Sequence, residues 1–291
     1  MRHENPLGYL LGLQGIALVR AFLGEHDRDF VERRIAEMRQ LLERFGRSPG
    51  VDVATVDSDL GYRAWAMTYD AEENPAFADR KIVERLVDDL EQADVLDAAC
   101  GTGRHSRWLT ARGHRVTGVD SSIEMLDHAG REAPGARFLQ GSLTCLPFAD
   151  GAFDLALCTL ALTHVRDLAA ATRELARVVR PRGRIVIVDV HPESVALGSV
   201  PAVRTPAGAP GRIETYRHPL GDYIRAALDS ELLIDQLLEP CPPAPPEASL
   251  ATDDLGPWDA WPWSLRAVVP EAAAAASRGV PSLLVLSLTR R

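Results

Sequence analysis

Lysine is almost absent from this sequence of 291 residues, which contains only Lys81. A phosphate-binding loop of the Gly-Lys-Ser/Thr type needs a lysine directly after its glycines, so the sequence excludes that class of nucleotide-binding protein. The net charge of −9 disfavours nucleic acid as the main partner, because phosphate backbones bind to basic surfaces.

Cysteine is also scarce, and no two cysteines form a CxxC pair. The four are Cys100, Cys145, Cys158 and Cys241. None lies near a histidine at the spacing of a zinc site, so we expect no metal centre. Their scattered positions are typical of reduced thiols, which indicates a cytoplasmic protein rather than a disulfide scaffold.

No apolar run is long enough to cross a membrane without interruption. Residues 7–22 come closest, but Gln14 and Arg20 interrupt them and no small-residue cleavage site follows. A bilayer needs about 20 consecutive apolar residues. We therefore expect a buried helix here and no membrane contact.

The first 60 residues contain two helical patterns. Asn5-Pro6 is a typical helix start, and the first helix is predicted to continue to about Gly24. A second helix, with apolar residues at helical spacing, is predicted to start near Asp27 or Asp29 and to stop at Gly46. We interpret residues 1–60 as a helical segment that covers the active site or joins two copies in a homodimer.

From residue 94 onward, strand and helix patterns alternate, which predicts a parallel α/β sheet with right-handed crossovers. Residues 191–218 lack clear periodicity and are predicted to form an insertion loop that shapes the acceptor pocket. The remainder, 61–291, is interpreted as one domain. Its strands are predicted at 94–98, 115–119, 136–139, 153–159, 184–190, 232–238 and 282–289.

The most informative motif follows the first of these strands. The strand contains Asp97 and leads into a Gly-x-Gly turn formed by Gly101 and Gly103, with a helix behind it. Such a turn brings backbone amides and a helix N-terminus close to a ligand. Asp120 ends the next strand, where a carboxylate can bind both hydroxyls of a ribose. A dinucleotide-binding fingerprint would have a third glycine, but Ser106 stands in its place.

These residues resemble motif I of the class I S-adenosylmethionine-dependent methyltransferases. The resemblance covers roughly residues 62–240 and extends to segments outside the glycine turn. Residues 121–126 resemble the stretch after the ribose-binding acid, residues 146–154 the approach to the fourth strand, and residues 174–183 the lead into the fifth.

The resemblance implies a Rossmann-like three-layer sandwich with a mainly parallel seven-stranded sheet and an N-terminal helical extension. It also implies S-adenosylmethionine as the cofactor. Met125 would pack on the adenine, while Ser142 departs from the aspartate that usually accepts a hydrogen bond from the adenine amino group. The predicted cofactor-binding residues are Tyr69, Asp97, Ala99, Gly101, Gly103, Asp120, Ser121, Met125, Gly141, Ser142, Leu143, Thr159 and Leu160.

Methyl transfer to many acceptors needs a base. His164 follows the fourth predicted strand, His191 follows the fifth, and His218 precedes the predicted helix that contains Tyr223. All three are expected to project from the carboxyl side of the sheet, where ligands bind in open α/β folds. The predicted catalytic residues are His164, His191, His218 and Tyr223.

Together these observations predict a methyltransferase that acts on a small molecule. We interpret the acceptor as a bacterial secondary metabolite of an aromatic or indole type. A cofactor-binding member of the fold that does not transfer methyl, such as a cyclase, is the first alternative, because fold alone does not fix a reaction. An NAD-dependent oxidoreductase is the second. The missing third glycine and the extra Asp97 count against it.

Overall fold

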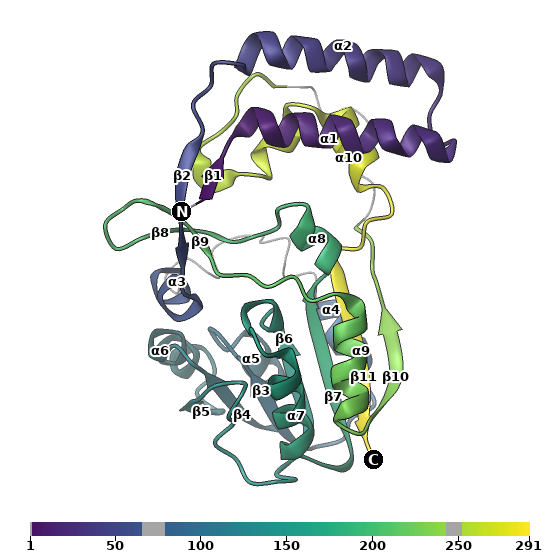
Figure 1. Ribbon diagram of the computed structural model, residues 1–291. Helices are drawn as coiled ribbons and strands as arrows, with labels where there is room; N and C mark the ends of the chain where they lie inside the picture. Colours follow the sequence, from purple (N-terminus) through teal and green to yellow (C-terminus); the bar gives the residue numbers. More distant parts are fainter. Residues whose placement is uncertain (1, 66–78, 243–251) are drawn as a thin grey trace. The chain divides into compact units, whose positions relative to one another are not determined.

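The computed structural model describes residues 2–65, 79–242 and 252–291, which form two compact units (Figure 1). The larger unit comprises 57–197, 213–240 and 281–291. The smaller unit comprises 1–56, 198–212 and 241–280. The first 56 residues therefore share a core with two segments far along the sequence.

A seven-stranded sheet forms the centre of the larger unit. Six strands are parallel to one another, and β11 runs antiparallel to both of its neighbours. This arrangement confirms the predicted Rossmann-like fold. In spatial order the strands are β10 (Leu232–Leu238), β11 (Leu283–Arg290), β7 (Val179–Val190), β6 (Phe153–Thr159), β3 (Asp94–Ala98), β4 (Arg115–Asp120) and β5 (Arg137–Gln140).

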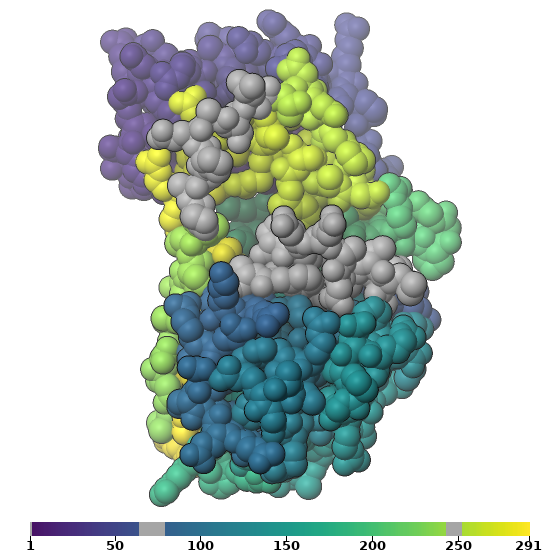
Figure 2. Space-filling model, turned by 180° about the vertical axis from the view of Figure 1, so that it is seen from behind, coloured from purple at the N-terminus to yellow at the C-terminus, as the bar shows by residue number. Residues whose placement is uncertain are grey.

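Helices cover both faces of this sheet and make it the middle of three layers. Leu96 and Ala98 of β3 pack in one core with helices α7 (Leu168–Val178) and α9 (Leu220–Asp229). Val95 belongs to the opposite core, with α4 (Asp79–Val87) and α5 (Arg104–Ala111). The face with α4 and α5, in blue, is seen in Figure 2. Alternating residues of a strand point to opposite faces, so a strand buried on both sides reads as continuously apolar.

The smaller unit combines helices with a four-stranded sheet of order β1-β2-β9-β8. Asn5 caps the first helix, as predicted, and Asp27, one of the two predicted starts, caps the second. The strands are β1 (Arg2–Glu4), β2 (Val51–Val56), β9 (Pro210–Ile213) and β8 (Ala202–Arg204). The helices are α1 (Pro6–Arg20), α2 (Arg28–Phe45) and α10 (Pro270–Ser277).

Helix α1 continues into the turn η1 (Ala21–Leu23), and together they are long and apolar enough to cross a membrane by length and composition alone. The helix packs against α2 and α10 through the buried side chains of Leu10, Leu13 and Ala17. Core helices pass the same test of length and composition, so this segment is weak evidence for a membrane span.

Residues 191–218 contain more regular structure than the predicted loop. They include α8 (Pro192–Ala196) and the strands β8 and β9, which pair with each other in an antiparallel hairpin. These strands have only three and four residues, too few to show a repeating pattern. Their place in a sheet with β1 and β2 depends on tertiary contacts that local periodicity does not reveal.

Candidate functional site

A cavity of about 360 Å³ opens where the strands β3, β4, β5 and β6 end. Because these strands are parallel, their carboxyl ends meet at one edge of the sheet, which is where ligands bind in open α/β folds. The lining residues are Ser58, Asp59, Tyr62, Ala99, Gly101, Val119, Asp120, Ser121, Met125, Gly141, Ser142, Leu143, Thr144, Thr159, Leu160, Ala161, His164 and Val165.

The turn after β3 has an unusual backbone. Ala99, Gly101 and Gly103 all have positive φ angles, of 57°, 53° and 79°. Glycine adopts such angles freely, but alanine does so at a cost in energy. Leu160, after β6, also has a positive φ of 54° and lines the same cavity. Non-glycine residues held in this conformation concentrate at functional sites.

Asp120 is fixed by two backbone donors. Its Oδ2 accepts a hydrogen bond from the Gly101 amide at 2.9 Å, and its Oδ1 accepts one from the Ser122 amide at 2.9 Å. Each carboxylate oxygen can accept further bonds, so the side chain can still bind two ribose hydroxyls. Burial raises the pKa of Asp120, while these two amides oppose that effect.

Apolar side chains form the next part of the cavity. Met125, in α6 (Ile123–Glu132), and Leu143 are both buried and both face the cavity. The Ser142 hydroxyl lies 3.0 Å from the Thr144 hydroxyl and accepts a hydrogen bond from the Thr144 amide, so it also stabilises its own turn. A Cβ at Gly141 would meet Val119 at 2.8 Å, which explains the glycine there.

The cavity fits the predicted cofactor in three respects. Its volume lies within the range of small-molecule sites, about 300–1,000 Å³. The Asp120 carboxylate is placed for a ribose, and Met125 and Leu143 offer an apolar surface for a flat base. Ten of the predicted cofactor-binding residues line it: Ala99, Gly101, Asp120, Ser121, Met125, Gly141, Ser142, Leu143, Thr159 and Leu160.

Two other predicted residues, Asp97 and Gly103, do not line the cavity. Asp97 is 1% exposed and does not line the cavity; its Oδ2 accepts a hydrogen bond from the Ser106 hydroxyl at 2.7 Å. It therefore anchors the start of α5 beneath the turn. Gly103 caps that helix, and a Cβ there would approach Ala129 to 3.0 Å. Tyr69 lies outside the described residues.

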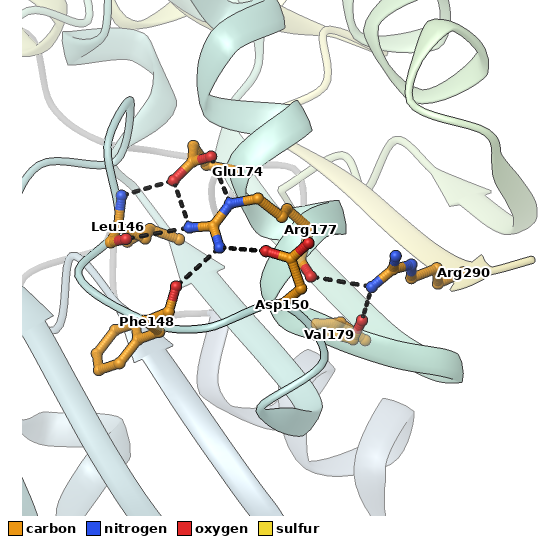
Figure 3. A network of polar contacts seen from close by, with 7 residues as sticks. All are labelled: Leu146, Phe148, Asp150, Glu174, Arg177, Val179 and Arg290. Carbon is orange, nitrogen blue, oxygen red and sulfur yellow. Dashed lines mark hydrogen bonds and ion pairs between the residues drawn. The ribbon is translucent and has the colours of Figure 1, made fainter.

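The segments 146–154 and 174–183, which resemble family segments, contact each other (Figure 3). Arg177 of α7 donates hydrogen bonds to the carbonyls of Leu146 and Phe148 and forms an ion pair with Asp150. Glu174 binds the same guanidinium and accepts a hydrogen bond from the Leu146 amide at 2.7 Å. This network holds the chain that leads from the cavity at Thr144 back into β6.

Another buried network joins α4 to the start of α5. Both carboxylate oxygens of Asp79, which is 0% exposed, accept hydrogen bonds from Arg104, at 2.9 and 2.7 Å. The Nε2 of His105 lies 2.9 Å from Oδ2 of the same carboxylate. The pKa of Asp79 is lowered, because these partners outweigh the opposing effect of burial.

Of the predicted catalytic residues, only His164 lines the cavity. His191 is 3% exposed, lies 2.9 Å from Glu239 and caps α8 through its Nδ1. His218 lies outside the cavity, with its Nε2 2.8 Å from the Val165 carbonyl oxygen. The structure thus brings one candidate base, rather than three, to the site.

Tyr223 is buried beneath the site and donates a hydrogen bond to Asp189 Oδ2 at 2.8 Å. Asp189 is 0% exposed, and burial raises its pKa to about 6. Its other oxygen accepts a hydrogen bond from the Thr163 hydroxyl, beside His164. Tyr223 therefore supports the chain near the cavity without facing it.

Sequence reasoning missed the residues that α3 (Ser58–Trp65) brings to the cavity. Ser58, Asp59 and Tyr62 line it, and the Tyr62 hydroxyl lies 2.9 Å from Nε2 of His164. The helix has only eight residues and lies outside the motifs, so no local pattern indicates its role. Among residues 2–65, 79–242 and 252–291, no cluster of His, Cys, Asp or Glu could hold a metal ion.

The sheet order, the glycine turn and the acidic residue at the end of β4 define an α/β protein of the Rossmann-like type. Comparison with known proteins narrows this class. Residues 96–187 match the family described as a methyltransferase domain. The S-adenosylmethionine-dependent methyltransferase of Mesorhizobium loti has a similar fold, with a TM-score of 0.53 and 23% identity, over 73% of this chain and 98% of that one.

Residues 96–187 thus match a methyltransferase domain, and the Mesorhizobium loti enzyme shares the fold of the larger part of the chain. The malonyl-[acyl-carrier protein] O-methyltransferase of Erwinia pyrifoliae is 40% identical over 37% of this chain and 42% of its own length. Five enzymes of that name match over 40% to 68% of their lengths, four of them over 52% or less. The [4+2]-cyclase SpnF shares the fold, with a TM-score of 0.52 and 18% identity, over 82% of this chain and 98% of that one.

Proposed function

We propose that this chain is an S-adenosylmethionine-dependent methyltransferase that acts on a small molecule. The observation that carries the proposal is the Asp120 carboxylate, fixed beside the glycine turn and lining a cavity of suitable size. Ser121 and Met125 would hold the same cofactor from α6 and the loop before it. Bound S-adenosylmethionine would supply a methyl group and retain the electron pair of the broken carbon–sulfur bond.

The residues of the chain would contribute positioning and base assistance. The cavity wall orients the acceptor, and ordering two reactants in one site removes a large part of a bimolecular barrier. His164 is the candidate base, since it is the one predicted catalytic residue at the cavity. We also propose that the acceptor is a small aromatic secondary metabolite and that the protein is located in the cytoplasm.

Calorimetric titration with S-adenosylhomocysteine and, separately, with NADH tests the cofactor. We expect the first to bind at one site per chain and the second not to bind. Binding of NADH alone would instead favour the oxidoreductase alternative and refute the proposal.

The likeness to the [4+2]-cyclase SpnF gives the non-methylating alternative a specific basis at the level of fold. Transfer of a radiolabelled methyl group from S-adenosylmethionine to acceptors in an extract of the source organism separates the two. The proposal expects labelled product that depends on the protein. Cofactor binding without any labelled product would favour the alternative.

A homodimer through the N-terminal helices is also part of the proposal. Large apolar side chains are exposed along them: Phe22 is 94% exposed, Leu23 75%, Val19 68% and Leu42 52%. Exposed apolar clusters of this kind are common at subunit interfaces. Light scattering of the protein after size-exclusion chromatography should give twice the mass of 31.7 kDa, and a mass of one chain would contradict the dimer.

A further inference from the structure

The geometry around His164 defines which ring nitrogen carries hydrogen. Nδ1 lies 2.8 Å from the carbonyl oxygen of Glu214, which can only accept, so Nδ1 is the protonated nitrogen. Burial lowers the pKa of His164, so the ring is neutral at pH 7. Nε2 therefore has a lone pair, and the Tyr62 hydroxyl, 2.9 Å away, must donate its hydrogen to it.

This pair is held firmly at the cavity. The carbonyl of Thr163, next to His164, accepts a hydrogen bond from the Tyr216 amide at 2.7 Å, and the Thr163 hydroxyl donates to the buried Asp189. Tyr62 comes from the separate helix α3, and its ring meets the imidazole edge-on at a centroid distance of 5.3 Å. Both side chains line the same cavity as Asp120.

The charges of the cavity restrict the acceptor. Its charged lining residues, within the described part of the chain, are Asp59 and Asp120, and no lysine or arginine lines it. The sequences 66–78 and 243–251 contain neither residue type. A carboxylate acceptor would meet like charges without a cationic partner. An ammonium acceptor would face the positive sulfonium of the methyl donor.

We propose that Tyr62 and His164 form a proton relay for an uncharged acceptor with a hydroxyl group. A phenol oxygen that donates its own hydrogen can still accept one from another hydroxyl. As the acceptor oxygen gains its methyl group, its proton moves to Tyr62 Oη and the Tyr62 proton moves to His164 Nε2. The product is a neutral methyl ether, and the positive charge of the sulfonium becomes that of the imidazolium, which then loses a proton to water. A carboxylate would have no proton to give at neutral pH, so the relay would serve no purpose for it.

The proposal rests on the proposed function, and its test uses the full chain saturated with S-adenosylhomocysteine. Nitrogen NMR of histidine-labelled protein, with His164 assigned from a His164→Gln variant, should show Nδ1 protonated and Nε2 unprotonated at pH 7. Phenol, benzoate and benzylamine serve as probes of similar size and different charge. We expect phenol to shift the Nε2 signal and to bind at least about tenfold more tightly than the other two.

Tyr62→Phe should weaken phenol binding about tenfold, the effect of one lost hydrogen bond, and leave S-adenosylhomocysteine binding unchanged. Tyr9→Phe, at a tyrosine of helix α1 that does not line the cavity, is the matched control and should change neither. A protonated Nε2 in the wild-type protein would overturn the relay. Benzoate or benzylamine binding as tightly as phenol would overturn the acceptor class. Both results can be obtained even if the Tyr62→Phe variant does not fold. Phenol binding that is unchanged in a folded Tyr62→Phe variant would overturn the relay too. Failure of S-adenosylhomocysteine to bind would instead refute the proposed function.

Discussion

The substitution Asp120→Asn tests the predicted ribose contact with little change in shape. In the wild type both carboxylate oxygens already accept hydrogen bonds, from the amides of Gly101 and Ser122. Asparagine has one acceptor oxygen, so its amino group must face one of these two N–H groups. The variant loses the negative charge and one of the two acceptors that a ribose would use.

Hydrogen bonds to a charged group contribute about 1.5–3 kcal/mol, so the variant should bind S-adenosylhomocysteine roughly 10- to 150-fold more weakly. Isothermal titration calorimetry measures this difference directly. Asp127→Asn is the matched control, because Asp127 is an exposed residue of the same helix that contains Met125. It should bind within twofold of the wild type.

Thermal unfolding of both variants without ligand shows whether the Asp120→Asn variant is folded at the titration temperature. A folded Asp120→Asn variant that binds S-adenosylhomocysteine within twofold of the wild type would refute the assignment of Asp120 to the ribose.

Three further substitutions test the packing and electrostatics around the site, each by urea unfolding. Gly118→Ala should destabilise the protein by about 1–3 kcal/mol, since the added Cβ would lie 2.6 Å from the Phe138 ring. Gly130→Ala is the control and should not destabilise the protein, because no atom lies within 4 Å of its added Cβ. Equal losses of stability in the two variants would contradict this prediction. Asp79→Asn should cost about 3–5 kcal/mol, because it removes the buried carboxylate that forms an ion pair with Arg104. Asp88→Asn, in an exposed pair, should cost under about 1 kcal/mol, and a small loss for both variants would refute the buried role. The pKa of Asp189 is raised to about 6 in the folded protein, so its carboxyl group keeps a proton there that it releases near pH 4 in the unfolded chain. The folded protein should therefore lose roughly 3 kcal/mol of stability as the pH rises from 4 to 6. Asp189→Asn should lack this loss, and parallel pH profiles would contradict the buried proton.

The larger unit could be predicted well from sequence because its signals are local. Strand β3 is buried on both faces through Val95, Leu96 and Ala98, and the turn after it needs glycine at positive φ. Asp120 could be identified for the same reason, since it directly ends a strand that leads to the carboxyl edge of the sheet.

Other features could not be predicted because they depend on tertiary contacts. The strands β8 and β9 form a sheet with the distant N-terminal strands, and nothing in their few residues indicates this partner. Likewise, the sequence predicts that His191 and His218 project from the same side of the sheet as His164, but packing directs them to Glu239 and to a backbone carbonyl. Tyr62 shows the converse, since only the fold brings it to His164.

A crystal structure of the protein with S-adenosylhomocysteine tests the central claim most directly. The account predicts the ligand in the cavity at the ends of β3, β4 and β6, with both ribose hydroxyls within hydrogen-bond distance of Asp120. The adenine should pack between Met125 and Leu143, and the sulfur should face Tyr62 and His164. A ligand bound at another place, or one whose ribose does not contact Asp120, would contradict the account.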